Sequence, residues 1–219
     1  MTSRTSSFGR RRLICAAAVA LSMWSVTACT TGGGTTPGAT AAPVTSSPTA
    51  TPTTTATPTP TASYKPANAS GRAQNVPVPV LPEAAKAETK EGAIAFAKHW
   101  YTVLNYAYQT GDFGPMEAVT GAACRMCAKV RPGIVEWNSG GRWIAGGLVV
   151  VKGAFTEFVR TAEGNYQVTT QLEQPVGFLY RADSSIEKSV PASQVLADIM
   201  TVRFSEGRWT ALDVDRLGV

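Results

Sequence analysis

The most regular alternation of apolar and polar positions in this chain predicts a long amphipathic helix at residues 89–110. Its apolar stripe recurs every three or four residues and comprises Ile94, Ala97, Tyr101, Leu104 and Tyr108. The opposite stripe is polar and comprises Glu91, Lys98, Thr102, Asn105 and Gln109. Thr89 is suited to cap this helix and Gly111 to end it. One face should therefore be buried against another element and the other should face water.

Two shorter helical stretches are expected after the long helix. Pro115 is suited to the first turn of a short helix, because its fixed φ angle fits that position. Residues 122–137 indicate a further helical stretch, and Pro132 followed by Gly133 should interrupt it.

From residue 142 onward the apolar period becomes two, which is typical of strands. Residues 142–160 predict one or two strands with glycines as bends, and residues 166–181 alternate clearly until Pro175 and Gly177 bend them. Residues 197–215 read as a hairpin that turns at Glu206 and Gly207. Met200, Val202 and Phe204 share one face of its first arm.

Helices followed by a run of antiparallel strands predict an α+β domain at residues 83–219. In this arrangement the N-terminal helices pack on one face of a curved antiparallel sheet, and the other face is polar.

Residues 1–28 have the three zones of a signal peptide. Arginines precede an apolar run from Leu13 to Ala28, and small residues stand before Cys29. The run has 16 residues, fewer than the roughly 20 that span a bilayer. An ordinary secretory signal and a retained helix are the alternatives.

The stretch Val26-Thr27-Ala28-Cys29 resembles a lipobox. This resemblance implies that the peptide is cut before Cys29 and that the Cys29 thiol carries lipid. The mature protein would then be anchored at the extracytoplasmic face of the cell membrane, and the membrane would be its first partner.

Residues 29–82 predict a disordered tether, or stalk. Between Cys29 and Lys65 there is no charged side chain, and Thr, Pro, Ala, Gly and Ser dominate. Such a segment cannot bury enough apolar surface to become ordered. Its repeated Thr-Pro pairs favour extended polyproline II.

The basic charge of the chain is confined to its first residues. The chain has 20 Lys and Arg against 15 Asp and Glu, but four arginines precede Cys29. The mature protein is therefore almost neutral, and no basic patch indicates nucleic acid as a partner.

Two segments carry a resemblance to a known superfamily. Residues 92–124, with a "TGD" turn after the long helix, resemble the opening of the nuclear-transport-factor-like (SnoaL-like) superfamily, and residues 200–215 resemble its final hairpin. The whole chain also resembles a family of actinobacterial lipoproteins of unknown function. The resemblance implies a cystatin-like cone fold that hosts enzymes, receptors and interaction modules, and it implies that two copies can pair through their sheets.

Cys124-Arg125-Met126-Cys127 is the one chemical motif of the domain. Outside the membrane two such cysteines favour a structural disulfide. A redox dithiol, with Arg125 and a helix N-terminus lowering a thiol pKa, is the alternative. Zinc is disfavoured because it needs four ligands and the chain offers one histidine and no second cysteine pair in the domain. We expect no metal and no cofactor.

Three further features have a structural and a functional interpretation. His99 lies near the edge of the polar stripe and is a weak candidate for a general acid or base. Asp112 is favoured as a helix cap. The aromatic residues favour a filled core over a ligand cavity, and they are Trp100, Tyr101, Tyr108, Trp137, Trp143 and Trp209.

The sequence therefore indicates a membrane-anchored envelope lipoprotein that acts as a non-catalytic binding or interaction module. Its partner would be an envelope protein or a small ligand. An enzyme or small-molecule receptor with a cone pocket is the alternative, and a thiol–disulfide protein at Cys124 and Cys127 is a third class. We expect no catalytic residue.

Overall fold

The computed structural model describes residues 62–218. The predicted signal peptide, Cys29 and most of the predicted tether lie outside these residues. A short 3₁₀ turn, η1 (Glu83–Lys86), precedes three helices, which are α1 (Lys90–Thr110), α2 (Gly114–Glu117) and α3 (Arg125–Trp137). Seven strands follow: β1 (Trp143–Gly146), β2 (Val150–Phe155), β3 (Tyr166–Glu173), β4 (Gly177–Tyr180), β5 (Ile186–Val190), β6 (Leu196–Ser205) and β7 (Arg208–Arg216).

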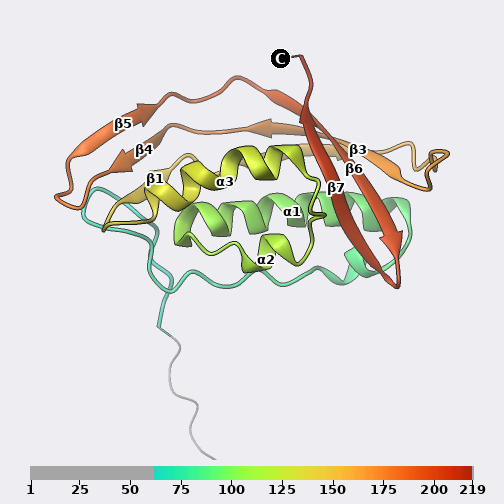
Figure 1. The fold of residues 1–219 in the computed structure, drawn as a ribbon, viewed down its shortest axis with the longest axis horizontal. Coiled ribbons are helices and arrows are strands. Elements are labelled where there is room, and N and C mark those ends of the chain that lie inside the picture. The colour runs from blue at the N-terminus through green and yellow to red at the C-terminus, as the bar shows by residue number, and fades with distance from the viewer. Residues whose placement is uncertain (1–61, 219) are drawn as a thin grey trace, which may run out of the picture. The chain divides into compact units, whose positions relative to one another are not determined.

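The strands form two antiparallel sheets, with orders β2-β3-β6-β7 and β1-β4-β5. Figure 1 shows β1, β4 and β5 near one end of α1 and the β6–β7 hairpin near the other. The expected mixture of helices and antiparallel sheet is confirmed, but the strands divide between two sheets. The chain passes from one sheet to the other between β1 and β2, between β3 and β4, and between β5 and β6. Pro175, which offers no backbone N–H for a ladder, lies in the second of these connections.

The ends of α1 follow the sequence prediction. The Thr89 hydroxyl accepts a hydrogen bond from the Gly92 N–H at 3.0 Å. At the other end Gly111 adopts φ 77° and donates its N–H to the Ala107 carbonyl. The buried face of α1 packs on the four-stranded sheet, and the core includes Phe96, Trp100, Val168, Met200, Val202 and Trp209.

Helix α3 runs without a break through Pro132, so the predicted interruption there is wrong. Pro132 and Gly133 are exposed, whereas Ile134 is buried in the core. The missing N–H of Pro132 leaves one carbonyl in the preceding turn without its helical donor, and tertiary packing offsets that loss.

Residues 64–75, which we call the N-terminal strap, lie against the folded region although the sequence assigned them to the tether. Lys65 and Gln74 exchange two backbone hydrogen bonds, at 3.0 and 2.9 Å. The Trp143 indole N–H donates to the Asn68 carbonyl at 2.9 Å. Ordered structure therefore begins ahead of residue 83.

A second contact holds the strap at the end of α3. The Arg72 guanidinium donates to the Asn138 carbonyl at 3.2 Å and to the Arg142 carbonyl at 3.3 Å. Trp143 stacks on Tyr180, with ring centroids 5.1 Å apart, and Ala67 packs on the same small cluster. The strap is therefore held by backbone acceptors and one arginine, and it buries little apolar surface.

Among the helices of residues 62–218, none combines the length and the apolar character that a bilayer span requires.

Candidate functional site

A cavity of about 280 Å³ lies between α1, α3 and the four-stranded sheet, and we call it the α1–α3 cavity. Its apolar and cationic lining from the two helices comprises Tyr101, Leu104, Tyr108, Met126, Lys129 and Val130. Strands β3, β6 and β7 contribute Leu172, Asp198 and Arg216. The cavity therefore combines an apolar wall with a small number of polar groups, as ligand sites do.

Asp198 is the centre of a buried polar network at this cavity. Its residue is 0% exposed. One carboxylate oxygen accepts from the Tyr101 hydroxyl at 3.0 Å. The Arg216 guanidinium donates to both oxygens, from Nε at 2.9 Å and from Nη2 at 3.4 Å. The Thr170 hydroxyl lies 3.0 Å from the Tyr101 hydroxyl and completes the network.

The network keeps Tyr101 protonated and Arg216 charged. Burial, and then the negative charge of Asp198, raise the pKa of Tyr101 far above its ordinary value, so its hydroxyl stays protonated and can donate. The hydrogen bond to Asp198 raises the pKa of Arg216, which stays cationic. Burial also raises the pKa of Tyr108, and the Arg216 charge partly opposes this effect.

Asp198 was not predicted as a site residue. The signal was present in the strand pattern, because Asp198 precedes Met200 by two positions and therefore faces the same way as Met200 and Val202. A charged residue on the buried face of a strand requires a partner. That partner is on β7, which pairs with β6 through the register Asp198 to Arg216.

Cys124 and Cys127 form a disulfide at the N-terminus of α3, with their Cα atoms 5.3 Å apart. Cys124 is the N-cap residue, and its sulfur accepts a hydrogen bond from the Cys127 N–H at 3.3 Å. The Cys124 residue is 2% exposed. The expected disulfide is therefore present, and it closes the first turn of α3.

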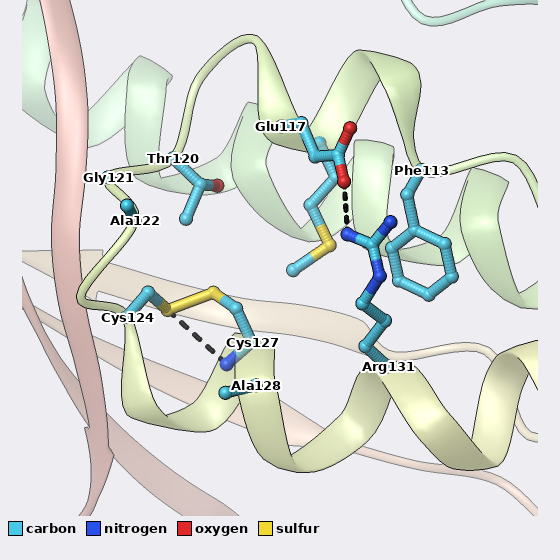
Figure 2. Close-up of a pocket in the computed structure, with 10 residues that line it drawn as sticks. Phe113, Glu117, Thr120, Gly121, Ala122, Cys124, Cys127, Ala128 and Arg131 are labelled. Carbon is cyan, nitrogen blue, oxygen red and sulfur yellow. Dashed lines mark hydrogen bonds and ion pairs between the residues drawn. A yellow bond between two sulfur atoms is a disulfide. The ribbon is translucent and has the colours of Figure 1, made fainter.

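The disulfide borders a second cavity, of about 250 Å³, which Figure 2 shows in close-up. Arg131 forms an ion pair with Glu117 across it, and its guanidinium lies 4.7 Å from the centre of the Phe113 ring. The two charged groups of this cavity are thus paired with each other, so the cavity offers a ligand fewer free polar groups than the α1–α3 cavity does.

His99 lies on α1 but is only 6% exposed, so the prediction that it lies near the polar stripe is wrong. Burial lowers its pKa, which keeps the imidazole neutral near pH 7. His99 does not line either cavity described above. The arrangement gives it no contact with a substrate bound in them.

The other sequence candidates have structural roles. The Asp112 carboxylate accepts a hydrogen bond from the Gly114 N–H at 2.8 Å, at the start of α2. Trp100, Tyr101 and Trp209 are buried in the core, as expected. Tyr101 and Tyr108 also line the α1–α3 cavity. Within residues 62–218, no cluster of three or more His, Cys, Asp or Glu is placed to hold a metal ion.

Over residues 62–215 the chain matches a family described as a family of unknown function, DUF6318. No curated protein matches it. Among solved structures it is similar to the crystal structure of the intermembrane space region of the chloroplast protein ARC6. The identity is 14% and the TM-score is 0.44, over 60% of this chain and 98% of that chain.

Proposed function

Because this chain belongs to the DUF6318 family, whose function is unknown, we propose a function from its own residues. The protein is a lipid-anchored binding protein of the cell envelope, and it holds a small ligand in the α1–α3 cavity. The observation that carries the binding role is the polar network around the fully buried Asp198, beside the apolar wall of the cavity.

Lipid attachment at Cys29 is supported by the sequence of residues 1–29. The arginine-rich start, the short apolar run and the small residues before Cys29 match the order that lipoprotein processing requires. The Thr- and Pro-rich residues that follow would hold the folded region away from the bilayer, on the extracytoplasmic side.

The network favours binding over catalysis. The Asp198 carboxylate already accepts three hydrogen bonds from Tyr101 and Arg216, so most of its roughly four acceptor positions are used by protein donors. Tyr101 remains protonated. These groups can orient a polar ligand, whereas a general base needs a free lone pair directed at the substrate.

The order of helices and the closing β6–β7 hairpin also support the resemblance to the nuclear-transport-factor-like superfamily. Under this proposal the α1–α3 cavity corresponds to the interior of the cone. The resemblance concerns the fold, and the choice of a binding function depends on the residues of the cavity.

The disulfide supports a structural role in preference to thiol–disulfide exchange. Cys124 is buried, and its sulfur caps α3. Arg125, the cation of the motif, pairs with Asp213 and Asp215, so its charge is largely neutralised near the sulfurs. A strongly negative reduction potential is therefore expected.

Binding of 1-anilinonaphthalene-8-sulfonate, an anionic apolar dye, tests the proposed site. The mature chain, residues 29–219, is used with Cys29→Ser, so that both the proposed lipid and the apolar signal peptide are absent and no detergent is needed. Met126→Trp fills the α1–α3 cavity and should abolish the rise in dye fluorescence. Val135→Trp, on the same helix at a 48% exposed position, should leave it unchanged.

The two variants are compared only after circular dichroism and thermal melting show that both are folded. Equal dye binding by Met126→Trp and the unsubstituted protein would exclude this cavity as the binding site. Because methionine is unbranched and adaptable, this position tolerates replacement better than a β-branched core residue.

A further inference from the structure

A third cavity, which is apolar and has a volume of about 210 Å³, lies directly beside the α1–α3 cavity, and we call it the β1–β4 cavity. Its side-chain lining comprises Ile144, Phe178, Leu179 and Val190. Tyr108 and Gln174 line both cavities, and we call these two residues the shared wall. Each cavity alone is smaller than the roughly 300 Å³ of the smallest typical ligand sites, whereas the two together fall within that class.

The wall has one fixed side chain and one free one. The Gln174 amide donates a hydrogen bond to the Gly147 carbonyl at 2.8 Å, which holds it in place. In the part of the chain that the structure describes, the Tyr108 hydroxyl has no hydrogen-bond partner. Tyr108 can therefore rotate without breaking a hydrogen bond of its side chain, and such a rotation would join the two cavities.

The charges lie at one end of this pair of cavities. Arg216 and Lys129 line the α1–α3 cavity together with one acid, Asp198. Arg216 uses Nε and Nη2 for Asp198, which leaves Nη1 for a ligand, and its side chain is 35% exposed. No ion pair within residues 62–218 engages Lys129. The excess of one positive charge favours an anionic group at this end.

The β1–β4 cavity has the opposite character. None of the described residues that line it is charged, and its side chains are aliphatic or aromatic apart from the shared wall. A ligand that fills both cavities must therefore be anionic at one end and apolar along the rest.

Resting on the proposed function, we infer that the two cavities bind one amphiphile with an anionic head and a single acyl chain. The head contacts Arg216 and Lys129. The chain passes Tyr108 and lies in the β1–β4 cavity. Fatty acids and lysophospholipids share this chemistry.

Calorimetric titration of tetradecanoate into the mature chain, residues 29–219 carrying Cys29→Ser, tests this inference below the concentration at which micelles form. We expect one tetradecanoate per chain. Tetradecyltrimethylammonium has the same chain length and the opposite charge, and it should bind at least about tenfold more weakly. Equal affinity for the two ions would overturn the role of the cationic end.

Ile144→Trp fills the β1–β4 cavity and tests where the chain lies. It should weaken tetradecanoate binding at least about tenfold, because the carbons by which tetradecanoate exceeds octanoate lose their site, and about two buried methylene groups already correspond to that factor. Octanoate, whose shorter chain stays in the α1–α3 cavity, should change by less than about twofold. Ile186→Trp, in the same sheet at a 52% exposed position, is the matched control.

Two other variants complete the test. Val190→Phe fills the same cavity from β5 and replaces Ile144→Trp if that variant does not fold. Lys129→Gln should weaken tetradecanoate binding about threefold, as expected for an exposed charge. Lys98→Gln, an exposed lysine on α1, should leave it unchanged.

The outcomes separate this inference from the proposed function. If Met126→Trp weakens both carboxylates but neither filling of the β1–β4 cavity affects tetradecanoate, the α1–α3 site stands and the inference is wrong. If Met126→Trp changes neither carboxylate nor the dye, the proposed site itself fails. Displacement of tetradecanoate by lysophosphatidylglycerol at lower concentration would support the inference with a phospholipid as the source.

Discussion

At the scale of single residues, Asp198 connects the fold to the proposed site. It satisfies the hydroxyl of Tyr101 and carries the counter-charge of Arg216, while its own side chain is fully buried. Such a carboxylate stabilises the protein only while all its partners remain.

Asp198→Ala is therefore expected to lower the free energy of unfolding by about 2–4 kcal/mol. The loss stays below that of a completely buried pair because Arg216 is partly hydrated. Urea unfolding measures it. Asp215→Ala removes a carboxylate that also pairs with an arginine but is 48% exposed, and it should cost less than about 1 kcal/mol. Similar losses for the two variants would contradict this account of the network.

His99 gives the protein a specific pH dependence. Burial lowers its pKa below the ordinary 6.5, so the unfolded chain binds this proton more readily than the folded chain. The contribution of neutral His99 to stability is therefore complete above about pH 6.5 and is lost as the pH falls below it. The slope should not exceed about 1.4 kcal/mol per pH unit.

Urea unfolding at about pH 7.5 and about pH 5.5 checks this dependence. His99 is the only histidine of the chain, so His99→Gln should flatten the profile over this interval. An unchanged slope in that variant would show that His99 titrates alike in the folded and unfolded states.

Residue-level prediction from the sequence succeeded where local geometry decides and failed where a distant partner decides. Thr89, Gly111 and Asp112 act at helix ends as their residue types predict. His99 was assigned to the edge of the polar stripe of α1 because helical periodicity fixes the direction of a side chain but not how far its surroundings bury it. The role of Asp198 depends on Tyr101, which is 97 residues away in the sequence.

At the scale of elements, α3 is attached at both ends. At its start the Arg125 N–H donates to the Asp213 carboxylate on β7 at 2.9 Å, and the guanidinium donates to the same carboxylate at 2.7 Å. At its end the Asn138 amide donates to the Tyr108 carbonyl of α1 at 3.3 Å. Gly111 lies against the Asn138 side chain, where a Cβ on residue 111 would come within 2.7 Å of the Asn138 Cβ.

Gly111→Ala should therefore lower the free energy of unfolding for two reasons, a strained positive φ and a contact with Asn138. Gly207 has nearly the same φ, 74° against 77°, and open space around it. Gly207→Ala should cost about 1 kcal/mol from backbone strain alone. Gly111→Ala should cost at least about 1 kcal/mol more, because packed atoms must move. Equal losses in thermal or urea unfolding would show that Asn138 moves freely.

The disulfide stabilises the first turn of α3. It closes a loop between residues three positions apart, so the chain-entropy estimate for replacing both cysteines by serine is a loss of about 2 kcal/mol. Urea unfolding of the double variant measures this loss. Dye binding in the α1–α3 cavity should persist, and its complete loss in a folded double variant would indicate a functional role for the sulfurs.

The elements differ in how far the sequence predicts them. The period of α1 and the β6–β7 hairpin are strong local signals, and both are observed as predicted. Strand β5 has a burial pattern that is almost entirely exposed, so no apolar alternation marks it. The division into two sheets depends on which strands pair across long distances, and apolar periodicity does not encode that choice.

At the scale of the whole molecule, the predicted boundary at residue 83 and the observed strap differ for a physical reason. The strap is held by backbone hydrogen bonds and by Arg72, so its composition resembles that of an unfolded segment. Apolar periodicity detects segments that bury side chains. Periodicity does not detect a segment whose backbone carbonyl accepts a hydrogen bond from a tryptophan side chain.

The proposed lipid anchor leads to a prediction for the full chain. Cys29→Ser should remove the mass of the acyl groups and should leave residues 1–28 attached, because the proposed processing needs the thiol. Mass spectrometry measures both effects, and Cys15→Ser, inside the proposed signal peptide, should change neither. A Cys29→Ser protein that carries the same acyl mass and the same cut as the unsubstituted protein would exclude Cys29 as the lipid site.

The attachment of α3 at its two ends affects how this scaffold can diversify. Met126, Lys129 and Val130 line the cavity between those attachments. Substitutions at these three positions can change the volume and charge of the cavity while Arg125 and Asn138 keep the helix in place. Over evolution, relatives that keep both attachments are therefore expected to acquire different ligand preferences on a common frame.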